Sequence, residues 1–224
     1  MNPIKRLLRP LYAPLVRSYR NHAKLKDQQR VIRAGVKDCA ESGKPLNVII
    51  GAGETRYENW VATDIPAFHV LKHEHWALLF QPASINRMLA EHVFEHLTVD
   101  ELSQFLRLAR LYMSKSGRIR LAVPDGNHPD ATYIEHVRPG GIGEGADDHK
   151  VLYNCDKIAN VLQESGYEFQ LLEYFDASGE FHRQPWQADD GFIGRSAAHD
   201  ERNVGGMLIY TSLIVDCWPL QYIK

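Results

Sequence analysis

The stretch Leu46-Asn47-Val48-Ile49-Ile50-Gly51-Ala52-Gly53 decides the fold of this chain. A short apolar run that ends in glycines is typical of a buried strand in a parallel sheet. Three further runs of this kind follow at residues 60–64, 87–91 and 118–123. The middle of the chain therefore predicts four strands, joined by longer and more polar segments.

The clearest predicted helix lies between the third and fourth of these runs. Thr98 and Glu101 have the spacing of a capping box, which satisfies free backbone amides at a helix start. Apolar residues then recur every three or four positions up to Met113. Lys115 is expected in the last turn, and Gly117 just beyond the end of the helix.

The rest of the chain continues the alternation of helix and strand. Helices are expected near residues 28–40 and 156–165, and late strands near 167–174 and 208–216. Strands that alternate with helices predict one α/β domain with a Rossmann-like, doubly wound sheet.

Composition excludes several classes of protein. The chain has 224 residues, of which 44% are hydrophobic and 24% charged, as in an ordinary soluble domain. This argues against a collagen, a coiled coil, a membrane channel and a disordered chain. Cys39, Cys155 and Cys217 are odd in number and far apart, so we expect reduced thiols and a cytoplasmic protein.

The N-terminal part of the chain is strongly basic. Residues 1–37 carry ten Lys or Arg and a single acid, Asp27. We expect residues 1–43 to form a helical extension with solvated charges and residues 44–224 to form the main domain. Pro10 and Pro14 should interrupt a long helix there. A peripheral contact with an anionic membrane through residues 1–37 is the alternative. No basic and aromatic pattern elsewhere predicts a nucleic-acid groove.

Polar residues follow the predicted strands where each one ends. They are Gly51-Ala52-Gly53, Asp64, Glu91-His92 and Asp125. In such sheets, ligands bind outside the carboxyl ends of the strands. Glycines let the backbone approach a ligand closely, and an acid after the second strand suits a ribose diol. These residues therefore predict a nucleoside site.

The same residues resemble a known family. Residues 46–53 with 60–64, the block Leu89-Ala90-Glu91-His92-Val93-Phe94-Glu95-His96-Leu97 and residues 116–125 are similar to predicted class I S-adenosylmethionine-dependent methyltransferases. The small bacterial branch with Glu-His-Val-x-Glu-His-Leu is the most similar, over roughly residues 44–217. The resemblance implies a seven-stranded sheet, mostly parallel, with an antiparallel last strand.

The resemblance also implies site residues and a cofactor, S-adenosyl-L-methionine. Gly51 and Gly53, with Ala52 between them, would pass beneath its methionine portion. Asp64, followed by Ile65, would bind the ribose hydroxyls, and Glu91 and His92 would line the floor. Trp76 is expected either to stack on the purine or to lie in the core. Ile49 and Thr55 depart from the family pattern, which keeps a non-catalytic adenosyl-binding protein as an alternative.

A second alternative lies within the same block. His92-Val93-Phe94-Glu95-His96 matches the H-x-x-E-H pattern of zinc peptidases, in which two histidines on one helical face bind zinc. This predicts a zinc-dependent hydrolase with Glu95 as its base if the segment is helical. If it is a loop, the spacing loses its meaning, and His96 and Glu95 are expected to pin the loop. The methyltransferase interpretation expects no metal.

The acceptor side is expected in residues 125–155. His149 is the first candidate for a base that takes the acceptor's proton, with His92 and Asp125 behind it. The glycines between 140 and 145 predict a flexible lid or a surface loop rather than a phosphate loop. A later polar group around Arg195, Asp200, Arg202 and Asn203 is expected to close over the same mouth or to remain at the surface. In-line methyl transfer to a small-molecule or sugar acceptor is the predicted reaction.

Overall fold

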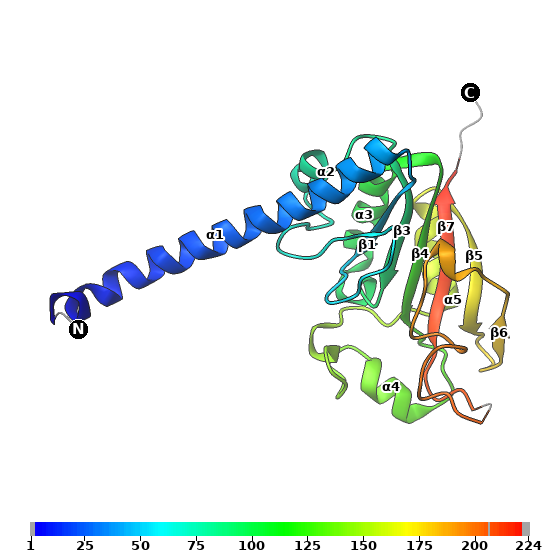
Figure 1. The fold of residues 1–224 in the computed structure, drawn as a ribbon. Coiled ribbons are helices and arrows are strands. Elements are labelled where there is room, and N and C mark those ends of the chain that lie inside the picture. Colours follow the sequence, from blue (N-terminus) through cyan, green and yellow to red (C-terminus); the bar gives the residue numbers. More distant parts are fainter. Residues whose placement is uncertain (1–2, 206, 221–224) are drawn as a thin grey trace.

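A single seven-stranded sheet forms the centre of the computed structural model, which describes residues 3–205 and 207–220 (Figure 1). Its strand order is β2-β1-β3-β4-β7-β5-β6. The strands are β1 Leu46–Ile50, β2 Val61–Ala62, β3 Ile85–Glu91, β4 Met113–Pro124, β5 Tyr167–Phe175, β6 Phe181–Arg183 and β7 Ser212–Pro219. β1 pairs in parallel with β2 and β3, and β3 with β4, whereas β7 runs antiparallel to β4 and β5. The predicted α/β sheet, mostly parallel with an antiparallel last strand, is confirmed.

Helices cover one face of this sheet. They are α1 Pro3–Ser42, α2 His73–Leu79, α3 Val99–Tyr112 and α5 Cys155–Glu164, whereas α4 Ala131–Val137 lies beyond the end of the sheet (Figure 1). Alternate residues of β1, such as Val48 and Ile50, join side chains from α1, α2, α3 and α5 in the larger core cluster. Trp76 of α2 is fully buried in this cluster and donates to the Val70 carbonyl over 2.8 Å. It is therefore a core residue and does not stack on a ligand.

Irregular chain covers the opposite face. Ile49 and Leu89 point to this side and pack with Ile193, and Trp186 packs against them. The connection between β1 and β2 spans only residues 51–60 and contains no helix, because a crossover helix normally needs about a dozen residues. The segment near Trp186 and Ile193 therefore covers this face of the sheet, as the helices cover the other.

Local signals located α3 correctly at its start and wrongly at its end. Thr98 accepts a hydrogen bond from the Glu101 amide over 3.2 Å, and the Glu101 carboxylate accepts one from the Thr98 amide over 2.8 Å. The helix ends at Tyr112, so Lys115 and Gly117 lie in β4 and not at a helix end. Sheet pairing decides this, because Met113 already lies opposite Ile85 of β3.

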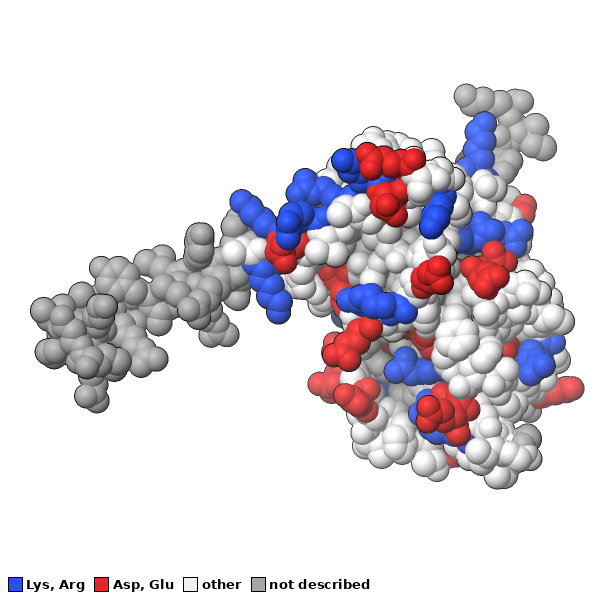
Figure 2. Space-filling view, in the orientation of Figure 1, with Lys and Arg blue, Asp and Glu red and all other residues white. Residues whose placement is uncertain are grey.

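The helix α1 runs through positions 10 and 14 without interruption, contrary to the prediction from the two prolines. A proline removes one backbone hydrogen bond and kinks a helix without always ending it. Near its other end, Ile32 and Cys39 lie in the core, while the helix projects away from the sheet toward its N-terminus (Figure 1). The exposed Lys and Arg side chains in the described part of α1 are blue in Figure 2. The side chains of residues 3–22 lie outside the described part, so a membrane contact through residues 1–37 stays a prediction.

The three cysteines are buried and form no disulfide, as expected. Among the described residues, no helix has both the length and the apolar character needed to cross a bilayer.

Candidate active site

The carboxyl ends of β1, β3 and β4 lie at one edge of the sheet, where a cavity of about 580 Å³ opens. A cavity of this size lies within the range of small-molecule sites, roughly 300–1,000 Å³. Its walls come from four segments, at residues 49–55, 89–96, 136–149 and 195–210. The fold thus brings together the two strand ends and the two later loops that the sequence singled out.

The glycine bend after β1 is bonded directly to Asp64. Gly51 and Gly53 have φ values of +60° and +51°, in the left-handed region that favours glycine. Asp64 Oδ2 accepts a hydrogen bond from the Gly53 amide over 2.8 Å, and Oδ1 accepts one from Ile65 over 2.7 Å. The predicted partnership of bend and acid therefore exists as a hydrogen bond.

Asp64 itself faces a second cavity. This cavity, of about 420 Å³, is lined by Gly53, Asp64 and Ile65 together with one face of α1. Gly51 lines the first cavity, and Ala52 lines both. The two cavities therefore meet at Ala52, and a ligand that reached from Gly51 to Asp64 would cross this residue.

Glu91 and His92 line the first cavity as predicted, and both are also held by other segments. The Glu91 carboxylate accepts hydrogen bonds from the amides of Gly194 and Arg195, over 3.3 and 2.7 Å. His92 has a φ of +54°, and its Nε2 lies 2.9 Å from Ser212 Oγ. Glu91 therefore fastens the 194–195 segment to the end of β3.

The segment from His92 to His96 is not an α-helix. Phe94–His96 form a single 3-10 turn, so two histidines on one α-helical face, as the zinc-peptidase pattern requires, are not present. Glu95 is buried, and His92 Nδ1 lies 3.2 Å from Glu95 Oε1. Burial raises the pKa of Glu95, but the contact with His92, the Glu95 backbone amide and the neighbouring His96 together hold that pKa below its ordinary value. The backbone of Glu95 does pin the loop, because its carbonyl accepts from Lys150 over 2.7 Å.

His149, the first candidate for a base, lines the cavity with 8% of its side chain exposed. Its Nδ1 lies 2.7 Å from the Val137 carbonyl, and its Nε2 lies 3.9 Å from Glu95 Oε1. The glycine-rich segment before it folds back on α4, since the Gly143 amide donates to the His136 carbonyl over 3.0 Å. A Cβ at Gly143 would lie 2.5 Å from that oxygen, which explains the glycine there.

Asp125 does not lie in either cavity, which corrects the prediction of a catalytic Asp125. Its side chain is fully buried. One carboxylate oxygen accepts from the Phe175 amide over 2.7 Å and the other from Asn127 over 2.9 Å. Burial raises its pKa to about 6, although these two hydrogen bonds lower it. Asp125 therefore joins the end of β4 to β5.

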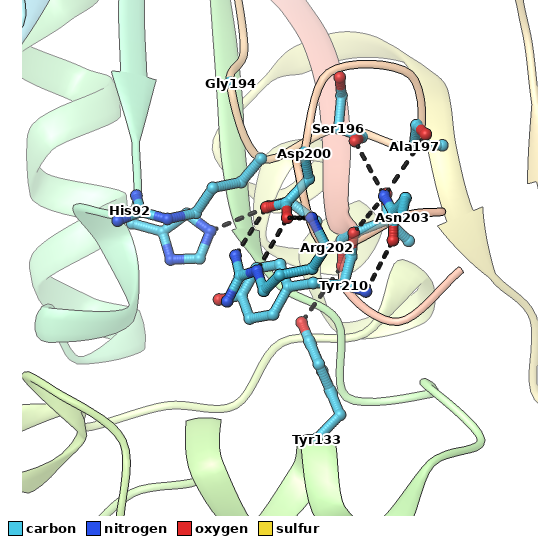
Figure 3. A network of polar contacts seen from close by, with 12 residues as sticks. His92, Tyr133, Gly194, Ser196, Ala197, Asp200, Arg202, Asn203 and Tyr210 are labelled. Carbon is cyan, nitrogen blue, oxygen red and sulfur yellow. Dashed lines mark hydrogen bonds and ion pairs between the residues drawn. The ribbon is translucent and has the colours of Figure 1, made fainter. Parts of the chain in front are cut away.

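The polar group near residues 195–210 forms a network over the mouth of the cavity (Figure 3). Arg202 pairs with both carboxylate oxygens of Asp200, over 2.8 and 2.6 Å, and its guanidinium carbon lies 3.5 Å from the Tyr210 ring centre. The Asn203 amide donates to the Tyr210 carbonyl over 2.6 Å and accepts from the Tyr210 amide over 2.9 Å. These contacts hold Arg202 and Tyr210 at the cavity, and Arg195 also lines it.

Sequence reasoning missed two parts of the site. Tyr210 was placed within a late strand, but β7 begins at Ser212, so Tyr210 is free to line the cavity. Glu95 is expected to pin a loop, which its backbone does, but its side chain also lines the cavity. The H-x-x-E-H block was a signal for Glu95. Nothing in the local sequence indicates where Tyr210 points.

No family model matches the chain, and no curated protein matches it. Among solved structures, a SAM-dependent methyltransferase from Archaeoglobus fulgidus is 11% identical, covers 84% of this chain and 92% of its own, and has a TM-score of 0.44. A SAM-dependent methyltransferase from Thermotoga maritima is also 11% identical, with coverages of 93% and 97% and a TM-score of 0.44. The 1,6-didemethyltoxoflavin-N1-methyltransferase of Burkholderia thailandensis is 16% identical, with coverages of 73% and 79% and a TM-score of 0.40.

Proposed function

We propose that this protein is an S-adenosylmethionine-dependent methyltransferase that acts on a hydroxyl group of a small-molecule or glycan acceptor. One observation carries the proposal: Asp64, which lines the cavity of about 420 Å³, is hydrogen-bonded to the glycine bend after β1, and Gly51 of this bend lines the neighbouring cavity of about 580 Å³. The resemblance of residues 46–53, 89–97 and 116–125 to class I methyltransferases supports it.

The residues at this edge fit the adenosine part of the cofactor. Each Asp64 oxygen accepts one backbone amide, and a carboxylate oxygen can accept more than one hydrogen bond, so both oxygens can still accept from a ribose diol. Ile65 and Val31 line the same cavity with 67% and 63% of their surface exposed, and they offer apolar area to a purine. A Cβ at Gly53 would meet nothing within 4 Å, so the bend leaves open space above it.

The first cavity fits the methionine end and the acceptor. When bound, S-adenosylmethionine supplies a methyl group that its sulfonium already activates. The chain's own task is to hold the acceptor in line and to exclude water, and such positioning contributes on the order of 7–11 kcal/mol. The network of Arg202, Asn203 and Tyr210 at the mouth suits this task.

A hydroxyl acceptor must also lose a proton. His149 Nδ1 lies against a carbonyl, which only accepts, so Nδ1 carries a hydrogen and Nε2 of the neutral ring keeps its lone pair. Both nitrogens of His92 have contacts, with Ser212 and Glu95. Of these ring nitrogens, Nε2 of His149 is therefore the one that can accept the proton of the acceptor hydroxyl.

The experiment is calorimetric titration with S-adenosylhomocysteine and S-adenosylmethionine. We expect wild type to bind both. Asp64→Ala should weaken binding at least tenfold, or by ~1.4 kcal/mol, because the ribose contact is lost. Glu58→Ala is the matched control, since Glu58 is an exposed acid in the connection between β1 and β2 and lines neither cavity.

Three outcomes would count against the proposal. Failure of the folded wild type to bind either nucleoside at millimolar concentration would overturn it. Equal affinities of wild type and Asp64→Ala for the nucleosides would show that Asp64 does not contact the ribose. Tight binding without transfer of labelled methyl to any glycan or small-molecule hydroxyl would favour an adenosyl-binding protein without catalysis.

A further inference from the structure

Three potential metal ligands converge on the floor of the first cavity. One carboxylate oxygen of Glu95 and one ring nitrogen each of His96 and His149 lie within 4.8 Å of one another. All three side chains line the cavity. Glu95 and His96 come from the turn after β3, whereas His149 comes from the segment after α4, so tertiary folding assembles the group.

Glu95 lacks the hydrogen bonds that a buried carboxylate needs. It is 1% exposed, and among the described residues neither of its oxygens has a hydrogen bond of acceptable geometry. Its nearest basic contact is His92 Nδ1, 3.2 Å from Oε1. A charge taken out of water is costly unless it is paired and hydrogen-bonded or coordinates a metal. The Oε2 oxygen has the greater need of a partner, because the His92 contact reaches only Oε1.

His149 presents an electron pair rather than a hydrogen to this carboxylate. His149 Nδ1 donates to the Val137 carbonyl over 2.7 Å, so Nε2 of the neutral ring is a lone-pair donor, 3.9 Å from Glu95 Oε1. A carbonyl behind the imidazole is the usual environment of a histidine that binds a metal through its other nitrogen, as at His149. His96 Nδ1 is buried and, among the described residues, has no hydrogen bond of acceptable geometry, although Asp148 Oδ1 lies 2.6 Å away.

We propose that Glu95, His96 and His149 bind one divalent transition-metal cation in this cavity. Two imidazoles and one carboxylate are a ligand set that suits zinc and its neighbours, and catalytic zinc sites keep a fourth position open. Bonds of about 2.1 Å in a tetrahedral site place ligand atoms about 3.4 Å apart. The separation of 3.9 Å between His149 and Glu95 therefore needs only a small contraction.

This site differs from the one that the H-x-x-E-H spacing predicts. His92 is not a ligand, because its Nε2 contacts Ser212 and its Nδ1 contacts Glu95. Glu95 is a ligand here and not a base. The third ligand, His149, stands 54 positions after Glu95 in the chain and has no place in the short motif.

The cation would also give the acceptor oxygen a place to bind, and this role rests on the proposed function. A bound divalent cation lowers the pKa of a coordinated hydroxyl, so that its proton leaves to water. The oxygen then forms the new bond to the methyl carbon as the bond from that carbon to sulfur breaks. With the cation bound, His149 is a ligand and no longer the base.

The test begins with chelator-treated, full-length protein titrated with Co²⁺ and with Zn²⁺. We expect one equivalent of Zn²⁺ to bind, and Co²⁺ to give visible absorption bands of the intensity typical of four-coordinate nitrogen and oxygen sites. His149→Ala and Glu95→Gln should each weaken Zn²⁺ binding at least tenfold. His182→Ala is the matched control, because His182 belongs to the other group of potential ligands, with Asp176 and Glu180.

Each outcome decides the proposal. Absence of Zn²⁺ binding by folded wild type at 100 µM metal, or Co²⁺ spectra of the aqueous ion, would overturn it. So would loss of binding in His182→Ala with retention in His149→Ala. Circular dichroism shows whether each variant folds. The Co²⁺ spectrum of wild type shows whether a four-coordinate site exists, and the comparison of His149→Ala with His182→Ala assigns the metal to one of the two groups of ligands.

Titration of the chelated protein with S-adenosylhomocysteine keeps this proposal separate from the proposed function. Nucleoside binding without Zn²⁺ binding would support the proposed methyltransferase function and overturn the metal site. Zn²⁺ binding without nucleoside binding would support the metal site and overturn the methyltransferase function.

Discussion

Replacing Gly51 by alanine should reveal how tightly the glycine bend packs against the turn after β3. Gly51 has a φ of +60°, and a Cβ added there would lie 2.6 Å from Val93 Cγ2. A left-handed backbone costs a residue with a Cβ about 1–2 kcal/mol. Overpacking against Val93 adds about 1–3 kcal/mol. Gly51→Ala should therefore lower the free energy of unfolding by about 2–5 kcal/mol.

Two further variants separate these costs. Gly53 has a φ of +51° with nothing within 4 Å of its Cβ position, so Gly53→Ala should show the backbone cost alone, about 1–2 kcal/mol. Val93→Ala removes both methyl groups and about 1–2 kcal/mol of apolar burial. In the double variant Gly51→Ala with Val93→Ala the steric clash disappears, so its loss should be smaller than the sum of the single losses by about 1–3 kcal/mol.

Urea denaturation of wild type and of the four variants measures these free energies of unfolding. The slope m of each curve checks that unfolding is two-state. Additivity of Gly51→Ala and Val93→Ala within about 0.5 kcal/mol would refute the clash. Equal losses in Gly51→Ala and Gly53→Ala would do so independently. Either result would mean that the bend does not press on the turn that carries His92 and Glu95.

Two other predictions concern buried carboxylates. Asp125 has a raised pKa of about 6 and the unfolded chain the ordinary 3.8, so its contribution to stability is full below pH ~4 and is lost as the pH rises through about 6. Denaturation of wild type at pH 4 and at pH 7 should show a fall of about 3 kcal/mol that Asp125→Asn lacks, and the same pH dependence in both proteins would contradict the assignment. Arg120 pairs with buried Asp216 over 2.7 and 2.8 Å, so Arg120→Met should cost about 3–5 kcal/mol in thermal or urea unfolding. Adding Asp216→Leu should recover part of this loss, and a double variant no more stable than Arg120→Met would contradict the cost of the unpaired carboxylate.

Much of the fold follows from local patterns in the sequence. The run from Leu46 to Ile50 forms β1, and the Thr98–Glu101 capping box begins α3. These two predictions held because each depends on neighbouring residues. The rule that parallel strands end at one edge also brings Asp64 to the glycine bend, and the two are hydrogen-bonded, but the contact of Asp64 with a ribose stays a prediction.

Local patterns failed where sheet pairing or burial competed with them. Gly117 has the position of a helix end, yet β4 pairs with β3 from Met113 onward and takes Gly117 into the sheet. Asp125 follows a strand as a site residue should, but its carboxylate bonds to the amides of Asn127 and Phe175 and lies outside both cavities. A sequence position does not say whether a carboxylate faces solvent or a backbone amide.

By itself, the sequence determined the order of β1 to β5 and β7 and the positions of α3 and α5, and it indicated the edge of the sheet at which the first cavity opens. Only the tertiary structure decided that Glu95, His96 and His149 meet on one cavity floor and that Asp64 faces a neighbouring cavity. The physical reason is the separation along the chain between the residues that interact. Helix capping and side-chain periodicity involve residues close in the sequence, so a local pattern reveals them. The meeting of Glu95 with His149 depends instead on how α4 and its following loop pack against the sheet.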